Sequence, residues 1–358
     1  MIYYYQTRIK SDKIADKWGE KMKELSTRQE QILYCLVREY VKSGTPVSSQ
    51  KILESTNLEW SGATVRNDMR KLDYLGYVFQ PHTSAGRVPT DKGLRFYVNE
   101  ILKLRKETKK SGSSIDVSID FPIGDLDKII QGAAKLLATT VKAFVIIEKP
   151  NPMYLRIRRV VLTPVTKNFS IVNIITELGL TSVLPIQHSE IYNIQEIEEF
   201  LNKSLDGILL SEFRAKLREV VERFSWVGGR LKEFIELSEK IASEKYEEYI
   251  TEGVFNLVNA KRFDEDKLKE IVRFSTNEEY YSKIFELGEG IFIGKEHNIK
   301  NFEQYSILIM PYFVFNREVG KIAVIFDKFS DYNRVFDSVE YVVNRLTEYF
   351  TVVARNVE

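Results

Sequence analysis

The sequence has little of what most catalytic, secreted or membrane-spanning proteins need. Its 358 residues include a single cysteine, Cys35, which excludes an intrachain disulfide and favours a reducing compartment such as the cytoplasm. We expect Cys35, on an apolar helix, to act as a small buried hydrophobe. The three histidines lie far apart, and no cysteine–histidine spacing is typical of a zinc site. No apolar run approaches the ~18 residues of a membrane helix, so we expect no membrane association.

The motifs of common enzyme classes are also missing. There is no G-x-S-x-G, no Walker loop and no glycine-rich dinucleotide motif after a strand. The glycines of GEGIFIG have the wrong spacing for a phosphate cradle. The carboxylates Glu244, Glu247 and Glu248 alternate with lysine, as on a solvated helix face. We therefore expect neither an enzyme nor a bound cofactor or metal.

Charge is unevenly distributed along the chain, although the formal net charge is only +1. Residues 1–110 hold 21 Lys+Arg against 13 Asp+Glu, and the remainder holds 31 against 38. A basic segment on an otherwise acidic protein indicates a polyanionic partner for that segment. The alternative is an ordinary solvated surface.

The patterned region begins with three helices and a hairpin. Apolar residues recur at helical spacing from Leu25 to Val41, after a capping-box pattern at Thr27 and Glu30, and Gly44 and Pro46 end the helix. A second helix is predicted from Ser48 or Ser49 to Glu54, and a third from Ser61 to Leu75. Strands at 78–79 and 87–88 flank a turn, and a helix follows over 90–106. This is the element order of a winged helix-turn-helix.

The third helix carries residue types that suit a DNA major groove. Val65, Met69, Leu72 and Leu75 form one apolar stripe, which turns the polar side chains outward. Arginine can read guanine, asparagine can read adenine, and helix N-termini favour phosphate. The predicted DNA-binding residues of the helices are Ser48, Ser61, Thr64, Arg66, Asn67, Arg70 and Lys71. The alternative is an amphipathic helix with a basic outer face.

The hairpin tip HTSAGR is the second predicted DNA-binding element. His82, Thr83 and Ser84 are suited to donate hydrogen bonds to phosphate oxygens. Arg87 is suited to a minor groove or to phosphate. The alternative is a plain polar turn.

The rest of the chain predicts two further domains of a multidomain α+β protein. The winged helix is assigned to residues 22–106 and a serine-rich linker to 107–118. Alternating strand segments predict an α/β domain with an antiparallel sheet over 119–190 and 286–358. The mainly helical residues 191–285 are predicted to form an insertion, with a third serial domain as the alternative. Its candidate core or interface residues are Ile235, Ile241, Tyr249, Val254 and Phe255.

Residues 24–100 closely resemble the bacterial family of heat-inducible transcription repressors named HrcA. The resemblance rests on the run RNDM–L–LGY–QPHTSAGR–PT–KG–RFYV and continues weakly through LDKIIQGAAKLLATTVKAFVIIEKP, ITELGL, IFIGKEHN and VGKIAVIF. The family usually has a glycine-proline-threonine-arginine-methionine run before an aspartate-tyrosine pair. Here only the pair remains, as Asp331 and Tyr332.

The resemblance implies an architecture, a target and partners. The architecture is a winged helix, a GAF-like domain over 119–190 and 286–358, and a dimerisation domain inserted at 191–285. The target is an inverted-repeat operator upstream of chaperone operons, bound by a homodimer in the bacterial cytoplasm, on the nucleoid. A further partner is the GroE chaperonin, which keeps the repressor active.

A small-molecule-gated winged-helix regulator is the alternative function. Its ligand would bind in the GAF-like domain, although fold analogy alone is weak support. The candidate pocket residues are Tyr305, Tyr312, Phe313 and Phe315, which equally suit a hydrophobic core.

Overall fold

The computed structural model describes residues 25–56, 60–82, 85–108, 125–187, 194–223, 248–258 and 265–356. The chain forms two compact units. The first comprises Met1–Ile147, Ile250–Met310 and Ile322–Val343, and the second comprises Glu148–Tyr249, Pro311–Lys321 and Asn344–Glu358. Within the described ranges, no helix is both long enough and apolar enough to cross a membrane.

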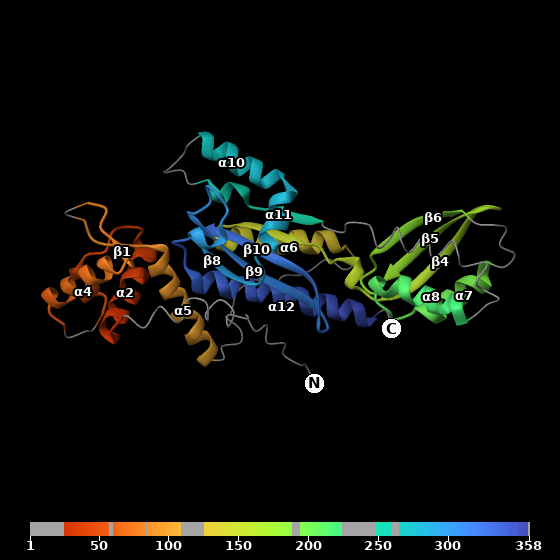
Figure 1. The fold of residues 1–358 in the computed structure, drawn as a ribbon, viewed down its shortest axis with the longest axis horizontal. Coiled ribbons are helices and arrows are strands. Elements are labelled where there is room, and N and C mark those ends of the chain that lie inside the picture. The colour runs from red at the N-terminus through yellow and green to blue at the C-terminus, as the bar shows by residue number, and fades with distance from the viewer. Residues whose placement is uncertain are drawn as a thin grey trace. The chain divides into compact units, whose positions relative to one another are not determined.

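The first unit begins with the predicted winged helix (Figure 1, red to orange). Its elements are α2 (Thr27–Ser43), α3 (Ser49–Glu54), α4 (Gly62–Tyr74), β1 (Val78–Phe79), β2 (Val88–Pro89) and α5 (Asp91–Thr108). The strands β1 and β2 pair antiparallel. The helix–helix–helix–hairpin order predicted from the sequence is therefore confirmed.

Apolar spacing and caps explain these helices. Ile32 and Leu36 of α2 are fully buried, as are Val65 and Leu72 of α4. The cap of α2 differs from the prediction by one residue, because Ser26 is the N-cap and its amide donates to Gln29 Oε1 at 3.0 Å. Gly44 ends the helix in the left-handed region at φ 64°, which glycine adopts without strain.

The first unit also holds most of a helix-covered sheet, whose residues Pro311–Lys321 belong to the second unit. The five strands lie in the order β7-β3-β10-β9-β8, and β3 pairs antiparallel with β10, as β8 does with β9. The bounds are β3 (Phe144–Glu148), β7 (Tyr249–Glu252), β8 (Gly290–Ile293), β9 (Tyr305–Val314) and β10 (Arg317–Asp327). The helices are α6 (Leu126–Val141), α10 (Glu265–Thr276), α11 (Glu278–Phe285) and α12 (Tyr332–Asn356), with the short helices η4 (Val254–Leu257) and η6 (Gly294–His297).

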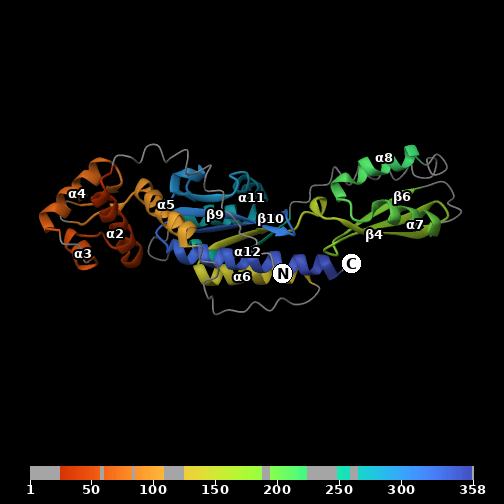
Figure 2. The same cartoon turned by 90° about the horizontal axis from the view of Figure 1, so that it is seen from below.

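Helices cover both faces of this sheet. Figure 2 shows α6 and α12 along one side of β9 and β10. The ring of Phe144 on β3 lies 6.1 Å from Phe274 of α10 and 6.4 Å from Tyr281 of α11. Because both faces are covered, β3 and β9 are buried along nearly their whole length.

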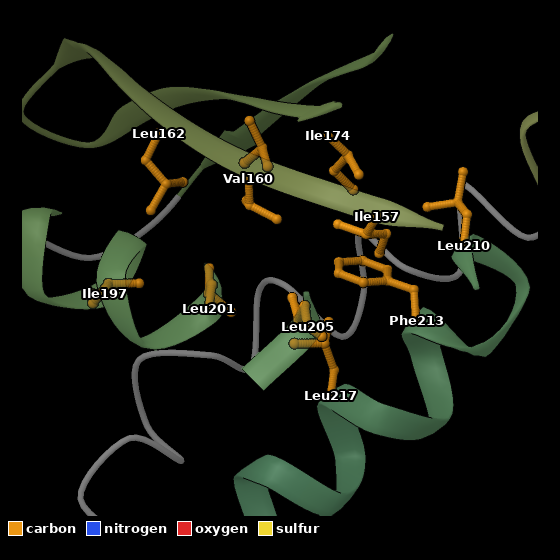
Figure 3. Close-up of a cluster of buried hydrophobic side chains, with 11 residues drawn as sticks. Ile157, Val160, Leu162, Ile174, Ile197, Leu201, Leu205, Leu210, Phe213 and Leu217 are labelled. Atoms are coloured by element: carbon orange, nitrogen blue, oxygen red, sulfur yellow. The ribbon is translucent and has the colours of Figure 1, made fainter. Parts of the chain in front are cut away.

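The second unit contains a separate antiparallel sheet. Its strands are β4 (Ile157–Thr166), β5 (Phe169–Thr176) and β6 (Thr181–Gln187), in that order. The helices are α7 (Ile194–Leu205) and α8 (Phe213–Arg223), with the short helices η2 (Pro152–Tyr154) and η3 (Leu210–Glu212). Figure 3 shows Val160 and Ile174 from the sheet facing Leu201, Leu205 and Phe213 from the helical side, all of them buried. The helices therefore cover one face of the three strands.

The domain boundaries differ from the prediction. We assigned residues 119–190 and 286–358 to one sheet, but the strands between 157 and 187 form their own sheet in the second unit. We assigned 191–285 to the insertion, but β7 joins the five-stranded sheet. The helix α5 also extends to Thr108, past the predicted start of the linker, whose residues 109–118 lie outside the described ranges.

The difference in boundaries changes which part of the fold holds the predicted core or interface residues of the insertion. Tyr249 lies on β7, at the edge of the five-stranded sheet, and Val254 and Phe255 lie on η4. Ile235 and Ile241 lie outside the described residues. The structure therefore places none of the three described residues on the helices that pack against the three-stranded sheet.

Candidate nucleic-acid interface

The helix α4 has one buried side and one polar, exposed side. Val65, Met69 and Leu72 are buried as the sequence predicted, whereas Leu75, the C-cap, is half-buried. The exposed side carries the predicted groove-reading residues Arg66, Asn67, Arg70 and Lys71. The four side chains together provide three positive charges and one amide, which suits the phosphates and base edges of a duplex.

Serine caps fix the N-termini of α3 and α4. The exposed Ser48 accepts a hydrogen bond from Lys51 N at 3.2 Å. Ser61 accepts from Thr64 N at 3.1 Å, and its hydroxyl lies 2.9 Å from Thr64 Oγ1. Such caps satisfy helix amides that otherwise lack a partner and set where each helix begins.

Arg66 is also connected to the preceding helix. Its Nε donates to Ser49 Oγ at 3.3 Å. This bond joins the first turn of α3 to the exposed side of α4. The Arg66 side chain is thus partly oriented before DNA arrives, which lowers the entropy cost of binding.

A buried carboxylate joins α4 to the start of α2. Arg28 Nε donates to Asp68 Oδ2 at 2.6 Å, and Gln29 Nε2 donates to Asp68 Oδ1 at 3.1 Å. Only 8% of the Asp68 side chain is exposed. Burial acts to raise the pKa of the Asp68 carboxyl, but the hydrogen bonds from Arg28 and Gln29 outweigh burial, and the pKa is lowered.

The lowered pKa of Asp68 predicts a contribution to stability that depends on pH. The carboxylate stabilises the fold above the unfolded pKa of about 3.9, and this contribution is lost as the pH falls through the folded value. We expect Asp68→Asn to make the loss of unfolding free energy below about pH 4 less steep. Urea unfolding followed by circular dichroism between about pH 3 and 6 measures this slope. Identical slopes for the variant and the wild type would contradict the prediction.

The hairpin between β1 and β2 is closed by local hydrogen bonds. Ala85 N donates to His82 O at 2.9 Å, and Gln80 Nε2 donates to Ala85 O at 2.9 Å. His82 is exposed, as expected of a residue at a wing tip, while Thr83 and Ser84 lie outside the described residues. The two described residues that flank Thr83 and Ser84, His82 and Ala85, are therefore joined by a main-chain hydrogen bond.

Arg87 occupies a different position from the one predicted. We expected its guanidinium at the wing tip and available to DNA, but its Nε lies 2.9 Å from Asp73 Oδ2, and 14% of the side chain is exposed. Its backbone bridges to Val47, ahead of α3. Arg87 therefore lies at the base of the wing, where the side chain turns back toward α4.

Two family models match this chain. One describes a winged helix-turn-helix transcription repressor, HrcA DNA-binding, and covers residues 24–102. The other describes the HrcA protein C-terminal domain and covers residues 127–336. This chain belongs to the HrcA family of heat-inducible transcription repressors. Family members are named for a non-enzymatic role, and the HrcA winged helix is their DNA-binding domain.

Individual HrcA relatives match over nearly the whole chain. The HrcA repressor of Thermotoga maritima is 39% identical over 341 residues, which is 95% of this chain and 98% of that protein. The HrcA repressor of Halalkalibacterium halodurans is 29% identical over 91% of this chain and 98% of that protein. A crystal structure described as that of a hypothetical protein is 37% identical and covers 92% of this chain and 100% of that one, with a TM-score of 0.63.

The structure of this HrcA repressor adds residues that the sequence did not single out. Asp68, Arg28 and Gln29 form the buried network, Ser49 contacts Arg66, and Asp73 pairs with Arg87. Asp68 lies on the buried stripe of α4 with Val65 and Leu72, and the local pattern gives no sign that its partner is Arg28, 40 residues earlier. Ser49 was recognised only as a possible first residue of the second helix.

Proposed function

We propose that this HrcA repressor binds an inverted-repeat operator upstream of chaperone operons as a homodimer. It acts in the bacterial cytoplasm, on the nucleoid, and it represses by excluding polymerase from the occupied promoter. The observation that carries the proposal is the exposed side of α4, where Arg66, Asn67, Arg70 and Lys71 project from a helix whose opposite side is buried. Two such helices in a dimer would enter major grooves about one helical turn apart, or a multiple of it.

The remaining proposed contacts lie around this helix. Thr64, at the N-terminal end of α4, is proposed to meet a thymine methyl or a phosphate. Ser48 and Ser61 lie at helix N-termini, where backbone amides favour phosphate. His82, Thr83 and Ser84 of the wing are proposed phosphate donors.

Operator recognition is tested by a band shift at stated salt, with an inverted-repeat duplex and a scrambled duplex. We expect Arg66→Ala to weaken operator binding by about 1–3 kcal/mol, with a smaller effect on the scrambled duplex, because Arg66 reads a base. Arg66→Lys is the matched control: it keeps the charge but loses the planar fork, so it should retain non-specific binding and lose discrimination. Equal affinity of the wild type for both duplexes would contradict the proposed function.

The homodimer is supported by the second face of the three-stranded sheet. Along β5, buried and half-buried residues alternate, and the helices cover the buried set. The other face is open to solvent and partly apolar: Val161, Ile171 and Ile175 are half-buried and Val183 is 59% exposed, and the polar residues of the same face are Arg159, Thr163 and Asn173. Val161 and Val183 lie on either side of Asn173 in one cross-strand row, because both pair with it. Ile171 and Ile175 lie on β5 in the rows next to it. A second copy of the same face is the occupant we propose, because an isologous contact produces the two-fold symmetry that an inverted repeat requires.

Maintenance of the active repressor by the GroE chaperonin is the remaining part of the proposal. The family resemblance alone supports it. In physical terms, a rise in temperature lowers the native fraction of a marginally stable repressor, and a chaperonin that refolds the chain restores it. Derepression during heat stress then follows from the population of native protein.

The small-molecule-gated alternative gains no support from the tyrosines that suggested it. The hydroxyl of Tyr305 donates to Leu257 O, and the hydroxyl of Tyr312 donates to Glu148 O at 2.6 Å. Both side chains are buried, with Tyr312 fully so. Their polar groups thus satisfy main-chain carbonyls, the ordinary arrangement for a core tyrosine.

A further inference from the structure

The base of the wing is hydrogen-bonded to the segment that precedes α3. Val47 N donates to Arg87 O at 2.9 Å, and Arg87 N donates to Val47 O at 2.8 Å. These bonds extend the β1–β2 ladder to the segment that leads into α3. Both the main-chain amide and the main-chain carbonyl of Arg87 are therefore hydrogen-bonded to Val47.

Gly86 makes this close approach possible. A Cβ atom at Gly86 would lie 2.4 Å from both the carbonyl carbon and the oxygen of Val47, a distance that real side chains do not adopt. Any larger residue would push the wing away from the 46–47 backbone. The position of Arg87 is thus set by backbone contacts before its side chain is considered.

The Arg87 side chain then reaches the recognition helix. Its Nε lies 2.9 Å from Oδ2 of Asp73, in the last turn of α4, and the two side chains are 14% and 34% exposed. A partly buried ion pair is screened less by solvent than a surface pair. The contact therefore joins the two elements that the proposed function assigns to DNA, the recognition helix and the wing.

We propose that Asp73 and Arg87 are positioning residues, whose ion pair holds the wing at a fixed place beside α4. The proposal rests on the proposed DNA binding and reverses the role first expected for Arg87. It also gives an acidic residue of a DNA-binding domain a favourable effect on binding. A carboxylate near a polyanion normally weakens binding, so a direct phosphate contact by Arg87 and a positioning role predict opposite signs for the loss of Asp73.

The test is the affinity of Asp73→Ala for the inverted-repeat and scrambled duplexes, measured by fluorescence anisotropy at several salt concentrations. We expect both affinities to fall, by roughly 5- to 30-fold for the operator, because the wing loses its fixed position. Unchanged or tighter binding would overturn the proposal, since removal of the carboxylate would then free Arg87 for phosphate. The direction of the affinity change is measured on both duplexes, so this test still works if the wild type binds the two duplexes equally well. Equal binding of the two duplexes by the wild type would instead contradict the proposed function.

Charge exchange distinguishes positioning from general destabilisation. Arg87→Asp alone should bind DNA weakly, and Asp73→Arg combined with Arg87→Asp should regain most of the lost affinity, because the pair is restored with reversed polarity. No recovery in the double variant would overturn the proposal. Glu54→Ala is the matched control: it removes an exposed carboxylate on α3 and should leave affinity unchanged or slightly raised. Thermal unfolding of each variant confirms that the native fold is retained.

Discussion

Replacing Arg95 with alanine is expected to lower the free energy of unfolding by about 3–5 kcal/mol, because the change leaves the Glu296 side chain, only 17% exposed, without its counter-charge. Arg95 lies on α5, and 6% of its side chain is exposed. Its Nε donates to Glu296 Oε1 at 2.9 Å, its NH2 group contacts Glu296 Oε2, and the same group donates to Ile291 O at 2.7 Å. Equilibrium urea unfolding of the DNA-free protein measures the loss.

Two further variants separate the effect of an uncompensated buried charge from the effect of losing an ion pair. Arg95→Met combined with Glu296→Leu should recover part of the loss, since no uncompensated charge remains, although Ile293 N then loses its bond to Glu296 Oε2 at 2.8 Å. Lys128→Ala breaks an ion pair whose side chains are 70% and 42% exposed, and it should cost about 0–1 kcal/mol. A cost for Arg95→Ala as small as that of Lys128→Ala would contradict the prediction.

The Arg95 pair belongs to a row of charged contacts along α5. Asp91 Oδ1 lies 2.6 Å from Lys328 Nζ at the start of the helix, and Arg105 lies 2.7 Å from oxygens of both Asp337 and Glu340 near its end. These contacts tie the last helix of the winged-helix domain to the five-stranded sheet and to α12, all within the first unit. Arg95→Ala is therefore expected to weaken the attachment of α5, the last helix of the winged-helix domain, to the five-stranded sheet.

The sequence was sufficient to predict the winged helix and which side of its third helix is buried. The apolar spacing of Val65, Met69 and Leu72 determined which side of α4 is buried. It could not reveal the buried Asp68 or the position of Arg87, because each depends on a partner distant in the chain, in α2 for Asp68 and in α4 for Arg87. Propensity and periodicity describe local structure and carry no information about which charged side chains meet.

The misplaced domain boundary has a physical explanation that was visible in the strand patterns. β3 begins with the apolar run FVII before Glu148, and β9 is apolar apart from Ser306, as is typical of strands covered on both faces. β5 alternates strictly between buried and half-buried residues, as in a strand covered on one face. The two patterns were assigned to one sheet, although a sheet with helices on both faces does not accommodate alternating strands in its interior.

The alternating strands lead to the second large expected effect: Val183→Asp should convert the repressor from a dimer to a monomer and weaken operator binding about 100-fold or more. An operator with two half-sites loses the benefit of linkage when the protomers separate. Val183 is 59% exposed, so a charge there is solvated in the monomer and becomes costly only when a second apolar face covers it. The same reasoning predicts little change in the unfolding of the separated protomer.

The measurement combines sedimentation equilibrium with the operator band shift. Val272→Asp is the matched control, because Val272 is 49% exposed on α10 and belongs to the first unit, not to the three-stranded sheet. It introduces the same charge at a similarly exposed valine and should leave both mass and affinity unchanged. If Val183→Asp sediments as a dimer, the proposed face is wrong, and the face that carries Val161, Ile171 and Ile175 needs another occupant. If it becomes a monomer but keeps full operator affinity, the face is an interface and the dimer is not what reads the inverted repeat.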